Sequence, residues 1–424
     1  MVPNGQSDHV VGKIQDKRSS SFNKHLGSLN SQRRRGKMQN HKSSPPLTVD
    51  IAQKKLAETV FAHTKDKKKA AGRALGTLVE VVTYYLVHAW GMRNNILIER
   101  PIPEYGNPKI KHNVEFTLHG INNEIPLNSE EEVSLPLSIA KLNKIFDLGS
   151  PNKKHQLLET AGIIRNSCVI KDDTSGRVSA LHLENHSTQS TRVSLIEVFE
   201  KPFALFECKR VGVEDGMRKG PQTIEKAKQG AYVAKTVSSI QKVWLPSGEQ
   251  GGLLFDDKGQ PIAFPYREIV KRIIETLEPQ ITIKDMVLTV GIVSNHGNWF
   301  TNDDPNKEMR VLTAAYDWLL FLTDVGLLQF IERLLGDQPG LPKASRAFLT
   351  SYGPGRNKNR FTKTRMDKEA HQELIDYFES NLEKVEGWFN VIGPSKGTVA
   401  ELRDILQTLA EVKWNDIHKE RGDE

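Results

Sequence analysis

The stretch Phe203-Ala204-Leu205-Phe206-Glu207-Cys208-Lys209 is apolar except for an acid and a lysine two residues apart. Its length and composition predict a buried β-strand. Since side chains alternate between the two faces of a strand, Glu207 and Lys209 are expected on the same face. A carboxylate and an ammonium in apolar surroundings are costly unless each has a partner. The stretch therefore predicts a functional site, with a divalent cation and a phosphate as the expected partners.

A second short strand, over residues 193–199, precedes this stretch and is separated from it by residues 200–202. The two strands are expected to form a hairpin, because Pro202 lacks the N–H group that a strand ladder uses. With a three-residue loop, Glu197 lies diagonal to Glu207 on the same face, about 7–8 Å away at Cα. A two-residue loop would turn Glu197 to the opposite face, so the expected pairing depends on the loop.

The pattern Glu197-x9-Glu207-Cys208-Lys209 resembles the core of the PD-(D/E)xK nuclease superfamily, best known from Type II restriction endonucleases. The resemblance implies an α/β fold with a restriction-endonuclease-like core, in which helices flank a mixed central sheet. The chain departs from the family pattern at the first acid, where Glu197 replaces the usual aspartate. Asp172 or Asp173 is the alternative first acid, although their segment resembles a turn and lies well upstream.

The resemblance also implies a catalytic set and a cofactor. Glu197 and Glu207 would bind one or two Mg²⁺ ions per site, and Lys209 would orient or deprotonate the attacking water. Family members commonly carry a glutamate on the helix before the sheet, and Glu80 matches that place. The alternative for Glu80 is an ion pair with a basic residue in the core. Glu115, on a strand expected over residues 113–119, is a further acidic candidate that ranks below Glu80.

The tripeptide acid-x-Lys alone carries little weight, because it starts at four positions in this chain: Asp66, Glu207, Asp256 and Glu411. Only the pattern at Glu207 ends a hydrophobic strand that another acid-bearing strand precedes. The alternative interpretation is a cross-strand ion pair at the edge of a sheet, which would contribute little to stability.

The formal net charge of the 424-residue chain is +7, and the whole excess lies in residues 1–49. These residues are rich in polar and basic side chains and have hardly an aromatic, so residues 1–47 are expected to form a disordered basic arm. The chain has no apolar run of the length that a membrane helix needs and begins without an apolar signal stretch. With only two cysteines, it is expected to be a soluble cytoplasmic protein that does not contact a membrane.

The remaining chain is expected to divide into two parts. Residues 48–300 would form the nuclease core, with an insertion at about 121–190, and residues 301–424 would form a helical C-terminal region. Within it, residues 340–366 carry seven Lys or Arg and no acid, and we expect a loop there that contacts DNA. A helix over residues 224–237 would also meet the DNA backbone. The expected DNA-binding residues are Lys226, Lys228, Gln229, Arg356, Lys358, Arg360, Lys363 and Arg365.

The function expected from the resemblance is magnesium-dependent cleavage of double-stranded DNA at a specific sequence, by a Type II restriction enzyme. A homodimer would match a palindromic site. No nucleotide cofactor is expected, because the chain has no Walker-type glycine loop. A structure-selective repair or recombination nuclease of the same superfamily is one alternative. A DNA-binding protein without catalytic activity, whose acids form salt bridges, is another.

Overall fold

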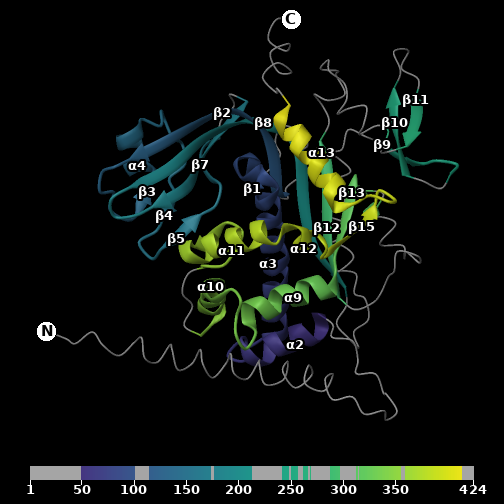
Figure 1. Cartoon of the computed structure of the whole chain (residues 1–424), viewed down its shortest axis with the longest axis horizontal. Coiled ribbons are helices and arrows are strands. Elements are labelled where there is room, and N and C mark those ends of the chain that lie inside the picture. The colour runs from purple at the N-terminus through teal and green to yellow at the C-terminus, as the bar shows by residue number, and fades with distance from the viewer. Residues whose placement is uncertain are drawn as a thin grey trace, which may run out of the picture.

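The computed structural model of the chain describes residues 49–100, 114–172, 176–212, 241–247, 250–255, 261–265, 268, 287–296, 312–313, 315–354 and 359–412 (Figure 1). The expected basic arm and the expected helix at 224–237 lie outside these residues.

A mixed sheet forms the centre of the molecule, as the sequence predicts. Its main path runs in the order β1-β2-β8-β12-β13-β15, and β7 and β6 extend it beside β8. β1, β2 and β8 are antiparallel neighbours, whereas β12 lies parallel to both β8 and β13. The strands are β1 (Ile96–Arg100), β2 (Val114–Ser129), β6 (Cys168–Asp172), β7 (Arg177–His186), β8 (Thr191–Gly212), β12 (Leu288–His296), β13 (Trp318–Leu322) and β15 (Phe389–Gly393).

Strand β8 overturns the expected hairpin, because residues 193–199 and 203–209 belong to one continuous strand. Pro202 does not turn the chain back. It pairs with His119 where the register between β2 and β8 shifts, and such an irregularity tolerates a residue without an N–H donor. The N-terminal part of β8, residues 191–199, pairs with β7, and its C-terminal part, residues 204–212, pairs with β12.

Helices cover one face of the central sheet and build the main core with it. Helix α3 (Lys67–Val87) packs against β8, and Figure 1 shows it passing through the middle of the molecule with α2 (Val49–Thr59) and α9 (Asp324–Leu335) at one end. The Asp66 side chain caps α3 by accepting from the Lys69 N–H. Among the described residues, the other α-helices are α4 (Ile139–Phe146), α10 (Pro342–Tyr352), α11 (Lys368–Ser380), α12 (Leu382–Glu386) and α13 (Val399–Glu411), and a π-helix (His88–Met92) and a 3-10 helix (Arg93–Asn95) follow α3.

Side chains alternate across the sheet as the strand period requires. Phe206 and Cys208 of β8 join the core that contains α3, and the Cys208 thiol donates to the Thr83 hydroxyl of that helix at 3.4 Å. Val293 and Leu319, on β12 and β13, belong to a smaller cluster on the opposite face. Glu207, between Phe206 and Cys208, is therefore directed away from α3.

The expected insertion at 121–190 contains the end of β2, the strands β3 to β7 and the helix α4. β2 continues to Ser129, and β6 and β7 extend the central sheet. A second sheet has the order β14-β5-β4-β3, so the C-terminal strand β14 pairs with a strand of the expected insertion. A third sheet has the order β11-β10-β9. Their strands are β3 (Leu137–Ser138), β4 (Gln156–Leu158), β5 (Ile163–Arg165), β9 (Gln241–Trp244), β10 (Gln250–Phe255), β11 (Pro261–Pro265) and β14 (Arg365–Asp367).

The C-terminal region is not purely helical, which corrects the expectation for residues 301–424. β13 and β15 both lie within this region, and β15 follows α12. β13 is a short apolar run that is buried on both faces, and periodicity alone does not separate such a run from a buried helix. Within the described ranges, no helix combines the length and the apolar character needed to cross a bilayer.

Candidate functional site

Three glutamates lie at one level on three neighbouring strands. Ile98 pairs with Phe116 and Arg100 with Val114, which places Glu99 of β1 level with Glu115 of β2. The pairing of Phe116 with Phe206 extends in register to Glu115 and Glu207. Like charges at directly facing positions destabilise a sheet, so this row requires compensating positive charge.

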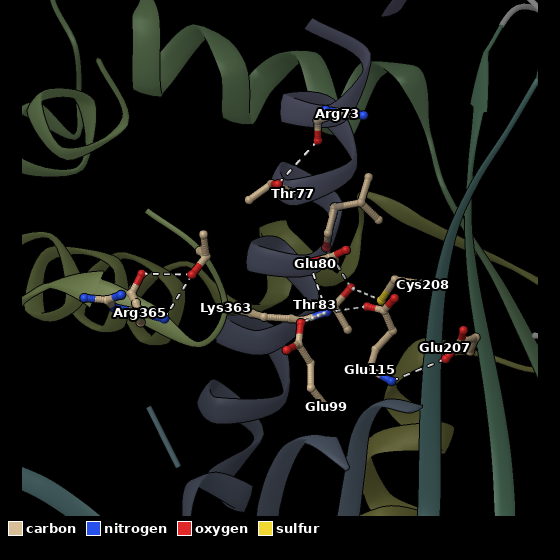
Figure 2. Close-up of polar contacts among 12 residues, drawn as sticks. Arg73, Thr77, Glu80, Thr83, Glu99, Glu115, Glu207, Cys208, Lys363 and Arg365 are labelled. Carbon is tan, nitrogen blue, oxygen red and sulfur yellow. Dashed lines mark hydrogen bonds and ion pairs between the residues drawn. The ribbon is translucent and has the colours of Figure 1, made fainter. Parts of the chain in front are cut away.

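Lys363 supplies positive charge to this row. Its Nζ atom lies 2.7 Å from the Glu115 carboxylate, 3.3 Å from that of Glu99 and 3.1 Å from that of Glu80, which projects from α3. Figure 2 shows the three carboxylates gathered around the end of the lysine side chain. The Lys363 side chain is 6% exposed, and its Nζ atom lies 5.8 Å from the centre of the Phe116 ring. We call Glu80, Glu99, Glu115, Glu207 and Lys363 the acid cluster.

The backbone of Lys363 is held by the strand-rich part of the chain. The Asn166 side-chain amide donates to the Lys363 carbonyl at 2.8 Å, and the Asn166 N–H donates to the Thr364 carbonyl at 2.9 Å. β14 begins two residues after Lys363 and pairs with β5. The backbone at Lys363 is therefore held in place by Asn166, and the side chain extends from it into the acid cluster.

The side chains of the acid cluster differ in burial, and burial and neighbouring charges shift the pKa values of Glu80 and Lys363. Burial, followed by repulsion from the Glu115 carboxylate, raises the pKa of Glu80 to about 7. Burial opposes the charge on Lys363, but attraction to Glu115 and Glu80 outweighs it and raises the pKa of the ammonium. The Glu99 side chain is 54% exposed and lies at the open edge of the group. Lys363 therefore stays charged, whereas Glu80 titrates near neutral pH.

Glu99 also adopts an uncommon backbone conformation. Its φ angle is 52°, in the left-handed region, which disfavours residues with a Cβ atom. Such conformations cost about 1–3 kcal/mol and gather at functional sites. The strain at Glu99 thus coincides with its contact to Lys363.

Glu207 lies beside Glu115, one of the three glutamates that contact Lys363. It is 2% exposed, and its Oε2 atom accepts from the Glu115 N–H at 3.3 Å (Figure 2). On its other side, Glu207 is level with Gly291 of β12, and the Tyr316 ring lies so close that a Cβ atom on Gly291 would be 2.6 Å from it. The backbone of Lys209 continues β8 and is level with Val293, whereas its side chain lies outside the described residues.

Glu197 does not join the acid cluster, which corrects the expected metal-ligand pair. It lies ten positions before Glu207 on the same strand, about 33 Å along a fully extended chain. Its pairing residues are Asn123 of β2 and Ser179 of β7, and its carboxylate accepts from the Asn122 side chain at 3.4 Å. The expectation failed because it required a turn at 200–202.

The alternative first acid is engaged elsewhere. Asp172 ends β6 and forms a 3.3 Å ion pair with the buried Arg100 guanidinium, which also contacts Glu200 at 3.5 Å. Asp173 lies outside the described residues. The acid that does face Glu207 is Glu115, the candidate that the sequence placed below Glu80.

The expected DNA-contact loop at 340–366 is partly helical, because α10 occupies Pro342–Tyr352. Its described basic residues at the C-terminal end have partners within the protein. Arg360 pairs with Asp367 at 3.7 Å, and Arg365 pairs with Glu159. With Lys363 in the acid cluster, these three residues have partners within the protein, and their contact with DNA stays a prediction. The other expected DNA-binding residues, Lys226, Lys228, Gln229, Arg356 and Lys358, lie outside the described residues.

The donor set of the acid cluster consists of carboxylates, which are the oxygen ligands that Mg²⁺ and Ca²⁺ prefer. Cys208 is close by, and burial raises the pKa of its thiol well above the usual range, so the thiol is protonated in the metal-free chain and donates to Thr83. Among the described residues, no three His, Cys, Asp or Glu side chains converge in a geometry ready for a metal ion. The cation around which Glu80, Glu99 and Glu115 converge is the Lys363 ammonium.

The chain was compared with known proteins in three ways. No protein-family model matches it, and neither a curated protein nor a solved structure does. The functional interpretation therefore depends on the geometry and chemistry of the chain itself.

Proposed function

We propose that the chain is a divalent-metal-dependent DNA endonuclease whose catalytic acids are Glu80, Glu115 and Glu207, with Lys209 as the catalytic lysine. The observation that supports it most is the convergence of the Glu80 and Glu115 carboxylates, from α3 and β2, on one cation, with Glu207 of the acid-x-Lys pattern bound to the Glu115 backbone N–H from the neighbouring strand β8. Glu115 takes the role first expected of Glu197.

The arrangement of elements around these acids agrees with the resemblance to PD-(D/E)xK nucleases. A helix with an inward glutamate, α3, precedes three antiparallel strands in the order β1-β2-β8, and β12 adds to β8 in parallel. The two facing acids lie on the second and third of these strands. A restriction-endonuclease-like core is therefore the fold that we propose for this part of the chain.

The carboxylate oxygens of Glu80 and Glu115 are of the type that a hard divalent cation prefers. Both already direct an oxygen at one cation, the Lys363 ammonium, and the Glu207 carboxylate accepts from the Glu115 backbone N–H. These carboxylates would hold one or two Mg²⁺ ions. A bound Mg²⁺ supplies charge neutralisation at the phosphate and acidifies a water molecule. Four clustered carboxylates would otherwise repel a polyanionic substrate, so DNA requires added positive charge at this place.

The protein side chains would activate the water, transfer protons and stabilise charge on the phosphate. Lys209 would lie on the same face of β8 as Glu207, where its ammonium would orient or deprotonate the attacking water and offset charge that develops on the phosphate. Glu80, with a pKa of about 7, would accept or hold a proton at neutral pH. The burial of Glu207 strengthens its interactions with bound charges because few waters screen it.

Incubation of the full chain with long unmethylated linear DNA tests the proposal. With Mg²⁺, we expect discrete fragments, as a sequence-specific restriction enzyme would give, and no cleavage when the metal is chelated. Preferential cleavage of branched DNA would favour a structure-selective repair nuclease instead. Complete absence of cleavage with both Mg²⁺ and Mn²⁺, on linear and branched DNA, would contradict the proposal.

A further inference from the structure

Lys363 occupies the position in which the proposed function places a metal ion. Its Nζ atom has three carboxylate contacts, at 2.7, 3.1 and 3.3 Å, and those carboxylates come from α3, β1 and β2. Two of the three, Glu80 and Glu115, are proposed metal ligands. A metal ion bound to these carboxylates would therefore lie close to the Lys363 ammonium.

A divalent ion and the Lys363 ammonium would repel each other if both were bound to the Glu80 and Glu115 carboxylates. A divalent ion needs close carboxylate oxygens, at about 2.0–2.1 Å for Mg²⁺. An ammonium at hydrogen-bond distance from the same oxygens would repel that ion strongly, because the group is largely shielded from water. Binding of the metal therefore requires that the Lys363 side chain move.

The lysine side chain is able to move while its backbone stays in place. Asn166 fixes the backbone directly after the point where the side chain branches off, through the Lys363 and Thr364 carbonyls. The flexible four-carbon stem lies between this anchor and the ammonium. The exposed Glu99 carboxylate, 3.3 Å from Nζ, offers a position at the rim of the group to which the ammonium can retreat.

We propose that Lys363 is an intramolecular competitor of the divalent cation, which holds Glu80 and Glu115 together until the metal displaces its ammonium toward Glu99. This inference rests on the proposed function, because it takes Glu80 and Glu115 as metal ligands. Lys363 thereby lowers the apparent affinity of the site for metal and sets the concentration at which the site fills.

Calorimetric titration of the full chain with Mn²⁺ tests the competition. In the variant Lys363→Met, the dissociation constant for Mn²⁺ is expected to fall at least tenfold, because no ammonium has to be displaced. Lys343→Met is the matched control, since Lys343 is exposed on the first turn of α10. The control is expected to bind Mn²⁺ as the wild type does. Unchanged or weaker Mn²⁺ binding by Lys363→Met, with normal binding by the wild type, would overturn the inference.

A second measurement uses only the wild-type chain and so does not depend on the folding of a variant. Lysine amines are labelled with an acylating reagent, with and without Mn²⁺, and the labelled positions are quantified by mass spectrometry. We expect labelling of Lys363 to rise several-fold with Mn²⁺, while that of Lys343 stays constant. Equal or lower labelling of Lys363 with saturating Mn²⁺ would overturn the inference.

The two proposals fail in different ways. DNA cleavage by the wild type, together with no gain in metal affinity in Lys363→Met, would remove the competition and leave the nuclease in place. If neither protein bound Mn²⁺ and neither cleaved DNA, the nuclease proposal and this inference would both be overturned.

Discussion

The Nζ atom of Lys363 lies 2.7 Å from the Glu115 carboxylate, although 248 residues separate them in the sequence. The contact joins the start of β2 to the segment just before β14. Breaking a buried ion pair on one side leaves the other charge without compensation, so each partner depends on the other. The C-terminal region is thus part of the acid cluster itself.

Replacement of the proposed catalytic residues should abolish cleavage but not DNA binding. We expect Glu115→Gln, Glu207→Ala and Lys209→Ala each to lower the cleavage rate at least about 100-fold, roughly 2.7 kcal/mol of transition-state stabilisation. Glu197→Gln is the matched control, because Glu197 lies on β8 but outside the acid cluster. Rates are measured in Mg²⁺ on linear DNA, and binding is measured in Ca²⁺. Full activity of Glu207→Ala would refute the assignment.

The stability of the metal-free chain should depend on pH through Glu80. Its pKa is about 7 in the folded chain and 4.5 as an ordinary glutamate, so the folded chain binds more protons between these values. Stability therefore falls as the pH rises from 4.5 to 7, and Glu80→Gln should remove this loss. In urea denaturation, the variant should gain stability relative to wild type on going from pH 5 to pH 8. Glu411→Gln, exposed at the end of α13, should show no such change.

Two glycines should respond to alanine in opposite directions. In Gly291→Ala the new Cβ atom would lie 2.6 Å from the buried Tyr316 ring, so we expect a loss of about 1–3 kcal/mol from overpacking. Gly76 lies inside α3 with nothing within 4 Å of a Cβ atom, and Gly76→Ala should stabilise the chain by about 0.4–1 kcal/mol. Denaturant titrations measure both. A stable Gly291→Ala protein would mean that Tyr316 can move away from β12.

Both cysteines should resist thiol reagents in the native chain. Cys168 is 0% exposed and burial raises its pKa to about 12, while Cys208 is 6% exposed and donates to Thr83. We expect no labelling by a maleimide at pH 7.5 and labelling of both residues in urea. Rapid labelling of Cys208 alone would indicate that α3 separates from β8 in solution.

Local patterns in the sequence predicted several parts of the fold correctly. The expected strands at 113–119, from residue 114 on, and at 203–209 belong to the central sheet, because residues of that type pack well on a pleated, buried surface. The helix that the resemblance implied around Glu80 is α3. Glu80 and Glu207 were chosen because an acid in apolar surroundings needs a partner, and both belong to the acid cluster.

The errors arose where a distant contact decides the structure. Pro202 indicated a turn locally, but pairing with β2 on one side and with β7 and β12 on the other keeps β8 extended. Lys363 lies in a stretch without acids, and its partners precede it by hundreds of residues. No local pattern connects it to Glu115. Glu99 has no sequence signal at all, since its role follows from the register of β1 with β2.

Because β8 is continuous, its two ends cannot change independently. A deletion of one residue near Pro202 would turn every side chain on one end of the strand to the opposite face, either reversing the pairing with β7 or pointing Glu207 into the helical core. An insertion or deletion that keeps both ends in register would therefore have to lie outside this strand. The pairing with β7 and the orientation of Glu207 thus depend on one uninterrupted count of residues.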